Sequence, residues 1–419
     1  MPVRAAGPLP WVGAGWGLLR NPTGLFERLR ARHGDTFVLD AFGHRFFCVF
    51  SPDGLRALYA QPEDEASFGL ATYTLIKAKV PIELLLGRRT HPKALFGNVK
   101  VEGYLDNLQG AVAQEIGRLG PSGRFEVFEE MRRLGHRMGL ASWCGAEAAS
   151  PPFVDRLIPL FDALDSSESF VRPARTLITW ATRKRSEWRA MAGIEGILGE
   201  ILDQRATQPP VGDFLDQIFG AYSDLPYDEQ VRGTARDVIV IHMGSQSNLY
   251  AALAWTFINL LLHPDLLARV RAGDDALLEQ CANESIRMVQ RSITMRQVLK
   301  PIAIDTGDGA YQLSPGTLLT TMLSVTNTTA AAGLDVFDPL HYEGRKLTSG
   351  VGLPTKELVS TFGHGPHSGP AARFSISAIR TSLGLLLDHY EFTSAAPRLR
   401  QIGGVARAAR PCWVGYAQA

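Results

Sequence analysis

Short strands are predicted near the N-terminus and again in the last third of the chain. Residues 36–39 and 45–50 are rich in aromatic and β-branched side chains and flank a glycine, which predicts a β-hairpin. Residues 310–313 and 317–323 have a strand-like composition, and the Ser-Pro-Gly sequence between them predicts a turn. The pattern therefore indicates small β-sheets outside the central part of the chain.

Helices are predicted for most of the remaining sequence. Over 92–204, apolar residues recur three and four positions apart, as on one face of a helix. Residues 236–262 are apolar on nearly every face, which predicts a buried helix of roughly 28 residues, about 40 Å long, across the middle of the domain. Further helices are predicted over 276–289 and 374–387. We expect a mainly α fold with small β-sheets (α+β), built as one domain over residues 1–419.

The buried helix carries small and polar residues at its centre, Gly-Ser-Gln-Ser-Asn at 244–248. Polar groups in a buried helix need hydrogen-bond partners or must line a cavity. One interpretation is a kink whose polar groups bond to neighbouring backbone. The other is a groove that faces a ligand, which the length of the helix favours.

Composition and charge exclude several kinds of partner. The 419 residues include 43 Lys and Arg against 42 Asp and Glu, a net charge of +1, and 45% are hydrophobic. This near-neutral balance, without a basic run, argues against nucleic acid, and no stretch approaches the roughly 20 apolar residues of a membrane span. The first ten residues hold one Arg and then prolines, unlike a secretory signal, so we expect a cytoplasmic protein.

Cysteines are few and irregularly spaced. A disulfide framework or a Cys-x-x-Cys metal site needs more of them, or closer pairs, than the chain provides. The four cysteines are Cys48, Cys144, Cys281 and Cys412.

A loop at 361–374 contains three glycines and two prolines and runs into an apolar helix. Such a composition is typical of a tightly shaped loop at a site. It is not a phosphate-binding loop, because the Gly-Lys-Ser/Thr ending is missing. His364 and His367 are three positions apart, but no other metal-ligand cluster stands near them, so we do not expect a metal site here.

The loop resembles the haem-binding loop of the cytochrome P450 superfamily, Phe-x-x-Gly-x-x-x-Cys before a long helix. Phe362 and Gly365 fit this pattern, and the cysteine position falls on Gly369. The resemblance implies haem b as cofactor. It also implies that His367 contacts one haem propionate and that Arg296 contacts the second.

Other family marks follow in the same order and cover nearly all of the chain. Glu284-x-x-Arg287 matches the family's structural pair. Residues 337–342 correspond to the family segment that ends in Pro-x-Arg-Phe. His341 occupies the place of the arginine that completes this triad. The Trp-x-x-x-Arg pair that often supports the propionates is missing, and His91 is the nearest candidate, followed by Lys93.

Gly369 is the largest departure from the family. In the family the Cys thiolate is the proximal iron ligand and favours O–O cleavage, whereas glycine has no side chain that binds iron. The glycine is either natural or an engineered replacement, since every flanking residue is family-like. With haem bound, we expect water, hydroxide or a small ligand in the proximal space, and no metal ligand from a protein side chain.

The centre of the buried helix is the second departure. It resembles the Ala-Ser-Gln-Ala-Asn version found in prostacyclin synthase and the sterol hydroxylases of bile-acid synthesis, rather than the usual acid and threonine. This resemblance places Asn248 over the distal face with Gln246 nearby, and aligns Ser247 and Asn248 with the proton-delivering pair. An Asn can hydrogen-bond to an iron-bound atom but cannot relay protons as a hydroxyl does.

The resemblance implies a monooxygenase-type oxidoreductase that acts on a hydrophobic small molecule, as in specialised metabolism, with a ferredoxin- or flavodoxin-type redox partner. Its substrate walls are expected at 68–86 and 159–180. One alternative is rearrangement of an activated O–O or N–O substrate without external electrons. Others are a non-catalytic ligand-binding protein and an acid–base enzyme without iron.

Overall fold

The computed structural model describes most of the chain. The described residues are 3–5, 11–77, 79–90, 98–165, 179, 181–290, 293–344, 347–365, 368–369, 371–393, 401 and 406–419. They divide into two compact units, each assembled from three separate stretches. Unit 1 contains 1–76, 283–369 and 401–407, and unit 2 contains 77–282, 370–400 and 408–419. That 1–419 act as one domain stays a prediction.

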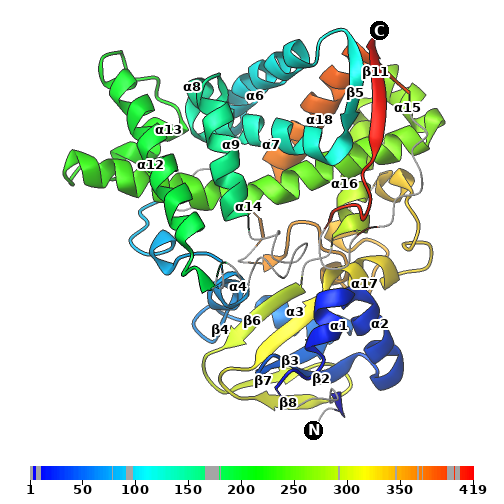
Figure 1. Ribbon diagram of the computed structural model, residues 1–419. Coiled ribbons are helices and arrows are strands. Elements are labelled where there is room, and N and C mark those ends of the chain that lie inside the picture. Colours follow the sequence, from blue (N-terminus) through cyan, green and yellow to red (C-terminus); the bar gives the residue numbers. More distant parts are fainter. Residues whose placement is uncertain are drawn as a thin grey trace. The chain divides into compact units, whose positions relative to one another are not determined.

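Unit 1 holds the largest sheet, a two-stranded sheet and the short helices around them (Figure 1). Its helices and 3₁₀ turns are α1 (Gly15–Arg20), α2 (Pro22–His33), α3 (Pro52–Ala60), α4 (Phe68–Ile76), α17 (Leu323–Thr329), η2 (Pro339–Tyr342), η3 (Leu347–Ser349) and η4 (Lys356–Leu358). Its strands are β1 (Val3–Ala5), β2 (Thr36–Ala41), β3 (His44–Val49), β4 (Ala66–Ser67), β6 (Ile293–Val298), β7 (Ile302–Asp305), β8 (Ala310–Leu313) and β9 (Leu318–Met322).

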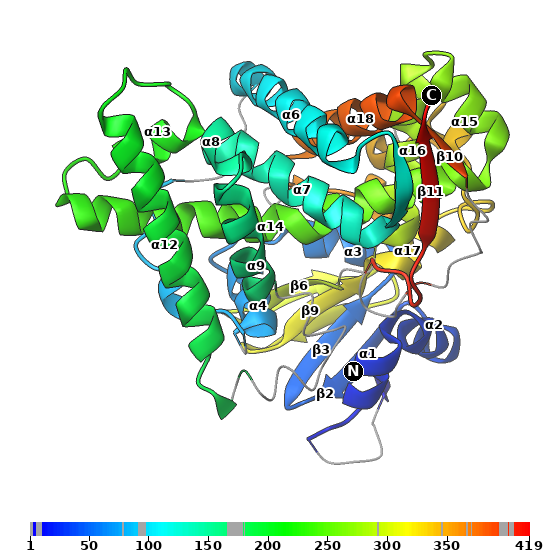
Figure 2. The ribbon, with the colours of Figure 1, turned by 45° about the horizontal axis from the view of Figure 1, so that its top comes forward.

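The main sheet of unit 1 has the strand order β1-β2-β3-β9-β6-β4 (Figure 2). The predicted hairpin is confirmed: β2 and β3 pair antiparallel, with Thr36 opposite Val49. Both turn residues, Phe42 and Gly43, have positive φ, as two-residue hairpin turns require. The predicted strands at 310–313 and 317–323 also form, but β8 pairs with β7 in a separate sheet while β9 enters the main one.

Aromatic side chains fill the space between α2 and this sheet. Phe26 of α2 is fully buried and lies 6.5 Å from Phe37 and 5.9 Å from Phe50 between ring centroids. Burying a side chain of this size contributes roughly 1.5–3 kcal/mol to stability. The strand composition that predicts the hairpin thus also supplies the core beneath it.

Unit 2 is mostly helical and contains a small sheet with the order β10-β11-β5. Its helices are η1 (Ile82–Leu84), α6 (Asn98–Leu119), α7 (Val127–Trp143), α8 (Gly145–Ala149), α9 (Phe153–Leu164), α12 (Arg185–Ala206), α13 (Phe214–Gly220), α14 (Tyr227–Leu262), α15 (Pro264–Arg271) and α18 (Ala372–His389). Its strands are β5 (Ser122–Glu126), β10 (Tyr390–Thr393) and β11 (Trp413–Gln418). Helix α16 (Asp275–Val289) contains the division between the units.

Helix α14 is the buried helix predicted from the sequence, and it is longer than expected. It runs without interruption for 36 residues, about 54 Å at 1.5 Å per residue. The extra turns precede Arg236 and are amphipathic, with Asp228 and Glu229 exposed, so an all-apolar criterion misses them. No single helix among the described residues is long and apolar enough to span a membrane, although α14 and α15 pass that test together across a 108° bend.

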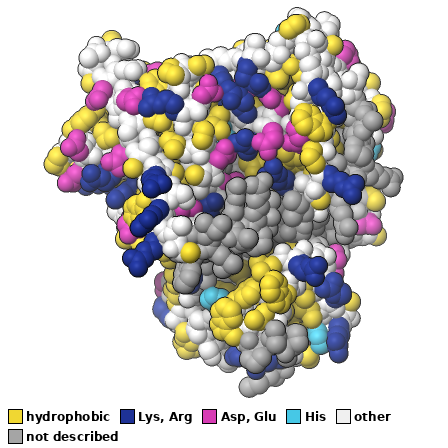
Figure 3. Space-filling model, viewed as in Figure 1, with side chains coloured by type: hydrophobic (Ala, Val, Ile, Leu, Met, Phe, Trp, Pro, Cys, Tyr) yellow, Lys and Arg dark blue, Asp and Glu magenta, His cyan; other side chains and the backbone are white. Residues whose placement is uncertain are grey.

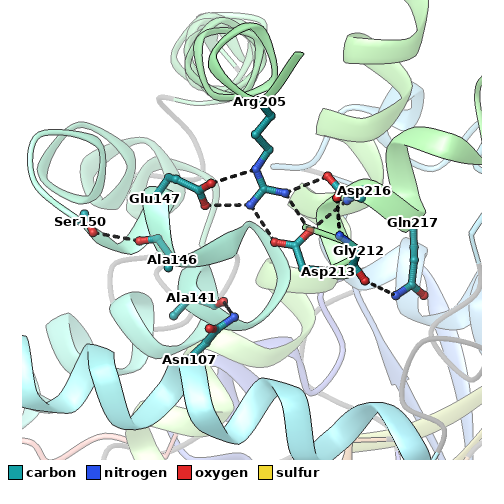
Figure 4. A network of polar contacts seen from close by, with 10 residues as sticks. All are labelled: Asn107, Ala141, Ala146, Glu147, Ser150, Arg205, Gly212, Asp213, Asp216 and Gln217. Carbon is teal, nitrogen blue, oxygen red and sulfur yellow. Dashed lines mark hydrogen bonds and ion pairs between the residues drawn. The ribbon is translucent and has the colours of Figure 1, made fainter. Parts of the chain in front are cut away.

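Acidic and basic side chains are interspersed over the helices of unit 2 on the face shown in Figure 3. One partly buried group ties three helices together (Figure 4). The Arg205 guanidinium of α12 donates to Glu147 of α8 at 2.7 Å, to Asp213 at 2.7 Å, and to Asp216 of α13 at 2.9 Å. Because several carboxylates surround it, the pKa of Arg205 lies above its ordinary value even though burial opposes this. Arg205 therefore fixes α8, α12 and α13 to one another.

A chain of hydrogen bonds runs through the core between α7, α9 and α14. The Trp143 indole N–H donates to His242 Nδ1 at 2.9 Å. Since an indole nitrogen only donates, the His242 proton lies on Nε2, which donates to His136 Nδ1 at 2.8 Å. His136 Nε2 in turn donates to Asp162 at 3.1 Å. The direction of every bond is thereby fixed.

Two members of this hydrogen-bonded chain, His242 and Asp162, have shifted pKa values. Burial, and secondarily the neighbouring His136, lowers the pKa of fully buried His242 well below its ordinary value. Burial alone would raise the pKa of Asp162, but the hydrogen bond from His136 and the charge of Arg132 outweigh it and lower that pKa. The core therefore contains a neutral imidazole in its stable state.

A second buried network lies in unit 1. The Arg287 side chain donates to both carboxylate oxygens of Glu284, at 2.7 and 2.6 Å, and neither side chain is exposed. Glu284 also bonds to His341 Nδ1 at 2.9 Å, so the three residues predicted as a structural group lie together. Arg287 donates further to the backbone carbonyls of Asn327 and Leu334, both at 2.6 Å. The pair thus connects α16 to segments 40 and more residues later.

We predict that Glu284→Gln destabilises the protein by about 3–5 kcal/mol, because it leaves Arg287 as an uncompensated buried charge. Urea unfolding at neutral pH measures this. Glu200→Gln is the matched control, since Glu200 pairs with Arg156 at an exposed site and should change stability little. Equal losses in both variants would contradict the prediction.

We also predict acid sensitivity from His242. A histidine whose folded pKa is lowered binds more protons when unfolded, so stability is complete above about pH 6.5 and falls below it, by up to about 1.4 kcal/mol per pH unit. His242→Gln should reduce this slope between about pH 5 and 6.5, as measured by urea unfolding across pH. His33→Gln, on half-buried α2, serves as control. An unchanged slope in His242→Gln would refute the assignment.

Candidate functional site

The loop predicted to carry the site is held by backbone hydrogen bonds within unit 1. The Asn327 side chain donates to the Ser360 carbonyl at 3.0 Å and accepts from the Ser360 N–H at 2.8 Å. The same side chain donates to the Arg287 carbonyl at 3.2 Å. The buried Glu284–Arg287 network therefore fixes the point at which the loop begins.

Within the loop, the chain folds back on itself. Gly363 and Gly365 have positive φ of 78° and 63°, which favours glycine at both positions. The Gly369 N–H donates to the Phe362 carbonyl at 2.5 Å and closes the turn. Phe362 and Gly369, the first and last positions of the predicted motif, are thereby brought together.

Gly369 has a backbone that a side chain can adopt. Its φ lies outside the positive region, unlike those of Gly363 and Gly365. A Cβ added here would meet the Phe362 carbonyl oxygen at 3.2 Å and the Phe362 Cβ at 3.7 Å, so the neighbour must give by a few tenths of an ångström. A cysteine is therefore compatible with the loop after a small adjustment.

The cysteines of this chain do not replace the missing ligand. All four are buried and form no disulfide: Cys48, Cys144, Cys281 and Cys412. Burial raises the pKa of the Cys48, Cys144 and Cys412 thiols, which keeps them neutral. Among the described residues, no group of three or more His, Cys, Asp or Glu side chains is placed to hold a metal.

Arg296 on β6 is a buried cation with little to neutralise it. It is 1% exposed, and within the described residues its hydrogen bonds go to the carbonyls of Tyr59 and Ala66, each at 3.2 Å. Its nearest carboxylate, Glu63, is 3.9 Å away and half exposed. Burial lowers the pKa of Arg296 below its ordinary value. A buried guanidinium whose close partners among the described residues are neutral carbonyls favours an anionic ligand.

Tyr59 and His364 lie beside Arg296 and were not identified as site residues from the sequence. Their rings meet edge to face with centroids 5.0 Å apart, and the Tyr59 carbonyl accepts from Arg296. His364 Nε2 donates to the Val359 carbonyl at 2.9 Å, and burial lowers the pKa of His364. His364 is therefore a neutral residue that supports the loop. The contact between Tyr59 of α3 and His364 of the loop joins residues about 300 positions apart, so a local sequence pattern does not show it.

In unit 2, two positions at the centre of α14 are exposed. Between Gly233 and Leu262 the exposed residues are Gly244 and Asn248, one turn apart. The helix stays unbroken because the Asn248 amide donates to the Gly244 carbonyl at 3.2 Å and the Ser245 hydroxyl donates to the His242 carbonyl at 3.0 Å. The backbone thus satisfies these polar groups without a kink, and one face remains available to a ligand.

The other predicted residues of α14 lie elsewhere on its surface. Gln246 is 2% exposed, and its amide nitrogen lies 3.4 Å from the Phe161 carbonyl of α9. Two residues correspond to about 200° around a helix, so Gln246 and Asn248 point to opposite sides. Ser247 lies between them and is partly exposed. Gln246 therefore contacts the core, and Asn248 faces outward.

Two predicted site residues, His91 and His367, lie outside the described residues, as does Lys93. Most of 166–180, within the predicted substrate wall 159–180, lies outside them as well. Their assigned roles stay predictions.

The residues of unit 1 fit one side of a haem group better than the other. Haem carries two propionates, and Arg296 offers a buried, incompletely neutralised guanidinium of the kind that binds carboxylates. Position 369 offers no side chain to the iron, although its backbone would allow one. Unit 1 thus offers a partner for a haem propionate, whereas position 369 offers no side-chain ligand to the iron.

Comparisons with known proteins agree with the motif-based expectation. No family model matches the chain. It is 27% identical over 235 residues to a putative cytochrome P450 137 of Mycobacterium tuberculosis, an alignment that covers 54% of this chain and only about half, 46%, of that relative. It is 20% identical to human 24-hydroxycholesterol 7-alpha-hydroxylase, covering 98% of this chain and 92% of that one.

A third relative is the sterol 14alpha-demethylase of Mycolicibacterium vanbaalenii, 22% identical over 90% of this chain and 88% of that one. Among solved structures, the retinoic acid bound cyanobacterial CYP120A1 superposes with a TM-score of 0.74 at 17% identity, over 100% of this chain and 99% of that one. The mainly α fold with small sheets is confirmed by this match. The ordered motifs, the fold and these relatives together support the cytochrome P450 superfamily as the family that this chain resembles.

Proposed function

We propose that this protein is a haem b-dependent, monooxygenase-type oxidoreductase scaffold that binds a hydrophobic small molecule. The observation that carries the proposal is Arg296, a buried cation beside a loop with the family's shape, whose hydrogen bonds among the described residues go to backbone carbonyls. When bound, haem supplies the redox chemistry of the site. Resemblance to the superfamily supports the cofactor.

The residues of this chain have distinct proposed roles. Arg296 binds a propionate, and Phe362, Gly365 and Gly369 shape the loop that supports the macrocycle. Asn248, exposed on α14, offers a carboxamide that hydrogen-bonds to a ligand but relays no proton as a hydroxyl does. Gln246 is proposed to hold α14 against α9 rather than to contact substrate.

An apolar substrate is supported by the relatives and by the exposed segment of unit 2 that precedes residue 91. Two relatives are named for reactions on sterols or oxysterols. Ile82 and Leu86 are exposed large apolar side chains in the predicted substrate wall 68–86. We propose a hydrophobic, sterol-sized molecule, with a ferredoxin- or flavodoxin-type donor of electrons. A cytoplasmic location and a role in specialised metabolism stay predictions.

Asn248 favours one alternative, rearrangement of an activated O–O or N–O substrate without external electrons. A carboxamide replaces the hydroxyl that oxygen-activating members use for proton delivery. Turnover of an organic hydroperoxide without any reductant would support this alternative. Turnover that requires both dioxygen and an electron donor would exclude it.

The role of Arg296 predicts a loss of haem affinity in Arg296→Gln. Removing a charge-assisted hydrogen bond to a carboxylate should weaken binding by about tenfold or more. Haem titration of the purified chain, followed by the Soret band, measures this. Arg45→Gln is the control, since Arg45 pairs with Asp40 on the surface of the same unit. Equal affinities in all three proteins would remove the central support for the proposal.

The geometry at position 369 predicts that Gly369→Cys restores a thiolate ligand. The backbone accepts a Cβ, and a thiolate bound to iron gives a distinctive spectrum of the reduced carbon-monoxide complex. We expect the chain with Gly369 to show haem absorption without the thiolate-type complex, and Gly369→Cys to show both. Gly369→Ser, which adds a Cβ but no thiol, separates ligation from packing. The absence of a Soret band in every variant would indicate a binding protein without haem.

A further inference from the structure

Asp237 of α14 is a fully buried carboxylate outside the residues assigned above. It accepts from Arg88 Nε at 2.7 Å, from the Thr90 hydroxyl at 2.7 Å and backbone N–H at 3.2 Å, and from the Tyr222 hydroxyl at 2.9 Å. Three of these four donors belong to one short stretch, residues 88–90. Asp237 therefore ties that stretch to the central helix.

Burial of the Asp237 carboxylate makes its contacts with 88–90 energetically important. A buried carboxylate is tolerated only when hydrogen bonds and an opposite charge replace its water, so Asp237 and Arg88 depend on each other. Burial, and then the hydrogen bond to Asp237, raises the pKa of Tyr222 to about 12, which keeps its hydroxyl a donor at neutral pH. Separating 88–90 from α14 would remove from Asp237 its opposite charge and three of its four hydrogen bonds.

Further contacts hold the rest of the segment 80–90, all within unit 2. The Arg89 N–H donates to the Tyr222 hydroxyl at 3.0 Å, and its guanidinium lies over the Tyr222 ring at 5.1 Å. Arg89 also pairs with Asp224. At the other end, Lys184 Nζ donates to the Val80 carbonyl at 3.0 Å. The segment is thus fastened at both ends, and η1 between them packs on α14.

Helix geometry places this tie on the ligand-facing side of α14. At 100° per residue, Asp237, Gly244 and Asn248 lie within about 40° of one another. Asp237 is buried because 88–90 covers it, whereas Gly244 and Asn248 are exposed two and three turns later, starting about 10 Å along the axis. The segment therefore covers one part of a face whose next part is open.

We propose that Asp237 is a positioning residue: by holding residues 80–90 on α14, it sets the size of apolar ligand admitted beside Gly244 and Asn248. Ile82 and Leu86, exposed on this segment, supply its apolar surface. The proposal rests on the proposed binding of a hydrophobic molecule, and its test does not require haem or turnover.

Trypsin provides the first test, because Arg88 and Arg89 are cleavage sites within the fastened stretch. Cleavage follows the population of the open segment, so Asp237→Asn should accelerate cutting after Arg88 or Arg89 by about tenfold or more, identified by fragment mass. Asp203→Asn is the matched control, since Asp203 also accepts a tyrosine hydroxyl, from Tyr227 at 2.6 Å, but at an exposed site. Equal cleavage rates would overturn the role of Asp237.

Ligand size provides the second test, using 2-naphthol and cholesterol as probes in equilibrium titrations of the full chain. We expect Asp237→Asn to weaken the binding of 2-naphthol relative to that of cholesterol, so that the ratio of the two dissociation constants changes by about fivefold or more. Asp203→Asn should leave this ratio unchanged. An unchanged ratio alongside faster cleavage would show that the segment is held but does not set ligand size, which overturns the proposal.

Tyr222→Phe keeps the test decisive should Asp237→Asn not fold. It removes one of the four hydrogen bonds to Asp237, together with the acceptor of the Arg89 N–H, and leaves the Asp237–Arg88 charge pair in place. It should shift both measurements in the same direction by a smaller factor. Failure of the proposed haem function would appear separately, as a missing Soret band, with both of these measurements unaffected.

Discussion

The hydrogen bonding of one buried ion pair underlies the candidate site in unit 1. Glu284 and Arg287 have no exposed surface, and such a pair is stable only when the remaining donors and acceptors are also satisfied. The backbone carbonyls of Asn327 and Leu334 meet that requirement, and the Asn327 side chain passes the constraint to Ser360 at the start of the loop. A helix and a loop more than 70 residues apart thus share one network.

Some other buried or partly buried charges among the described residues are matched by opposite charges. Asp237 has Arg88, and Arg205 has carboxylates on three sides. Arg296 differs, because backbone carbonyls are its close partners among the described residues. The proposed propionate of haem would supply the opposite charge that these carbonyls do not provide to Arg296.

The sequence allowed the local elements and the motif order to be predicted, since both depend on short-range pattern. The hairpin at 36–50 follows from aromatic and β-branched composition around a glycine, and the helix over 236–262 from a long run that is apolar on nearly every face. The partners of Asp237 and His242 could not be predicted in this way. They lie 149 and 106 residues away, and nothing in a local window distinguishes a buried aspartate or histidine that has such a partner from an exposed one. The turns of α14 before Arg236 were not predicted either, because their amphipathic sequence resembles that of a surface helix and not of a buried one.

The conformation of the loop around Gly369 does not depend on the side chain that would bind iron. Its conformation depends on Asn327, on two glycines with positive φ and on the closing bond between Gly369 and Phe362, all of which involve backbone or distant side chains. The identity of the side chain at 369 contributes little to that conformation. A chain of this kind can therefore lose or regain an iron ligand in a single substitution while its fold persists, so divergence of activity in such a scaffold need not pass through an unstable intermediate.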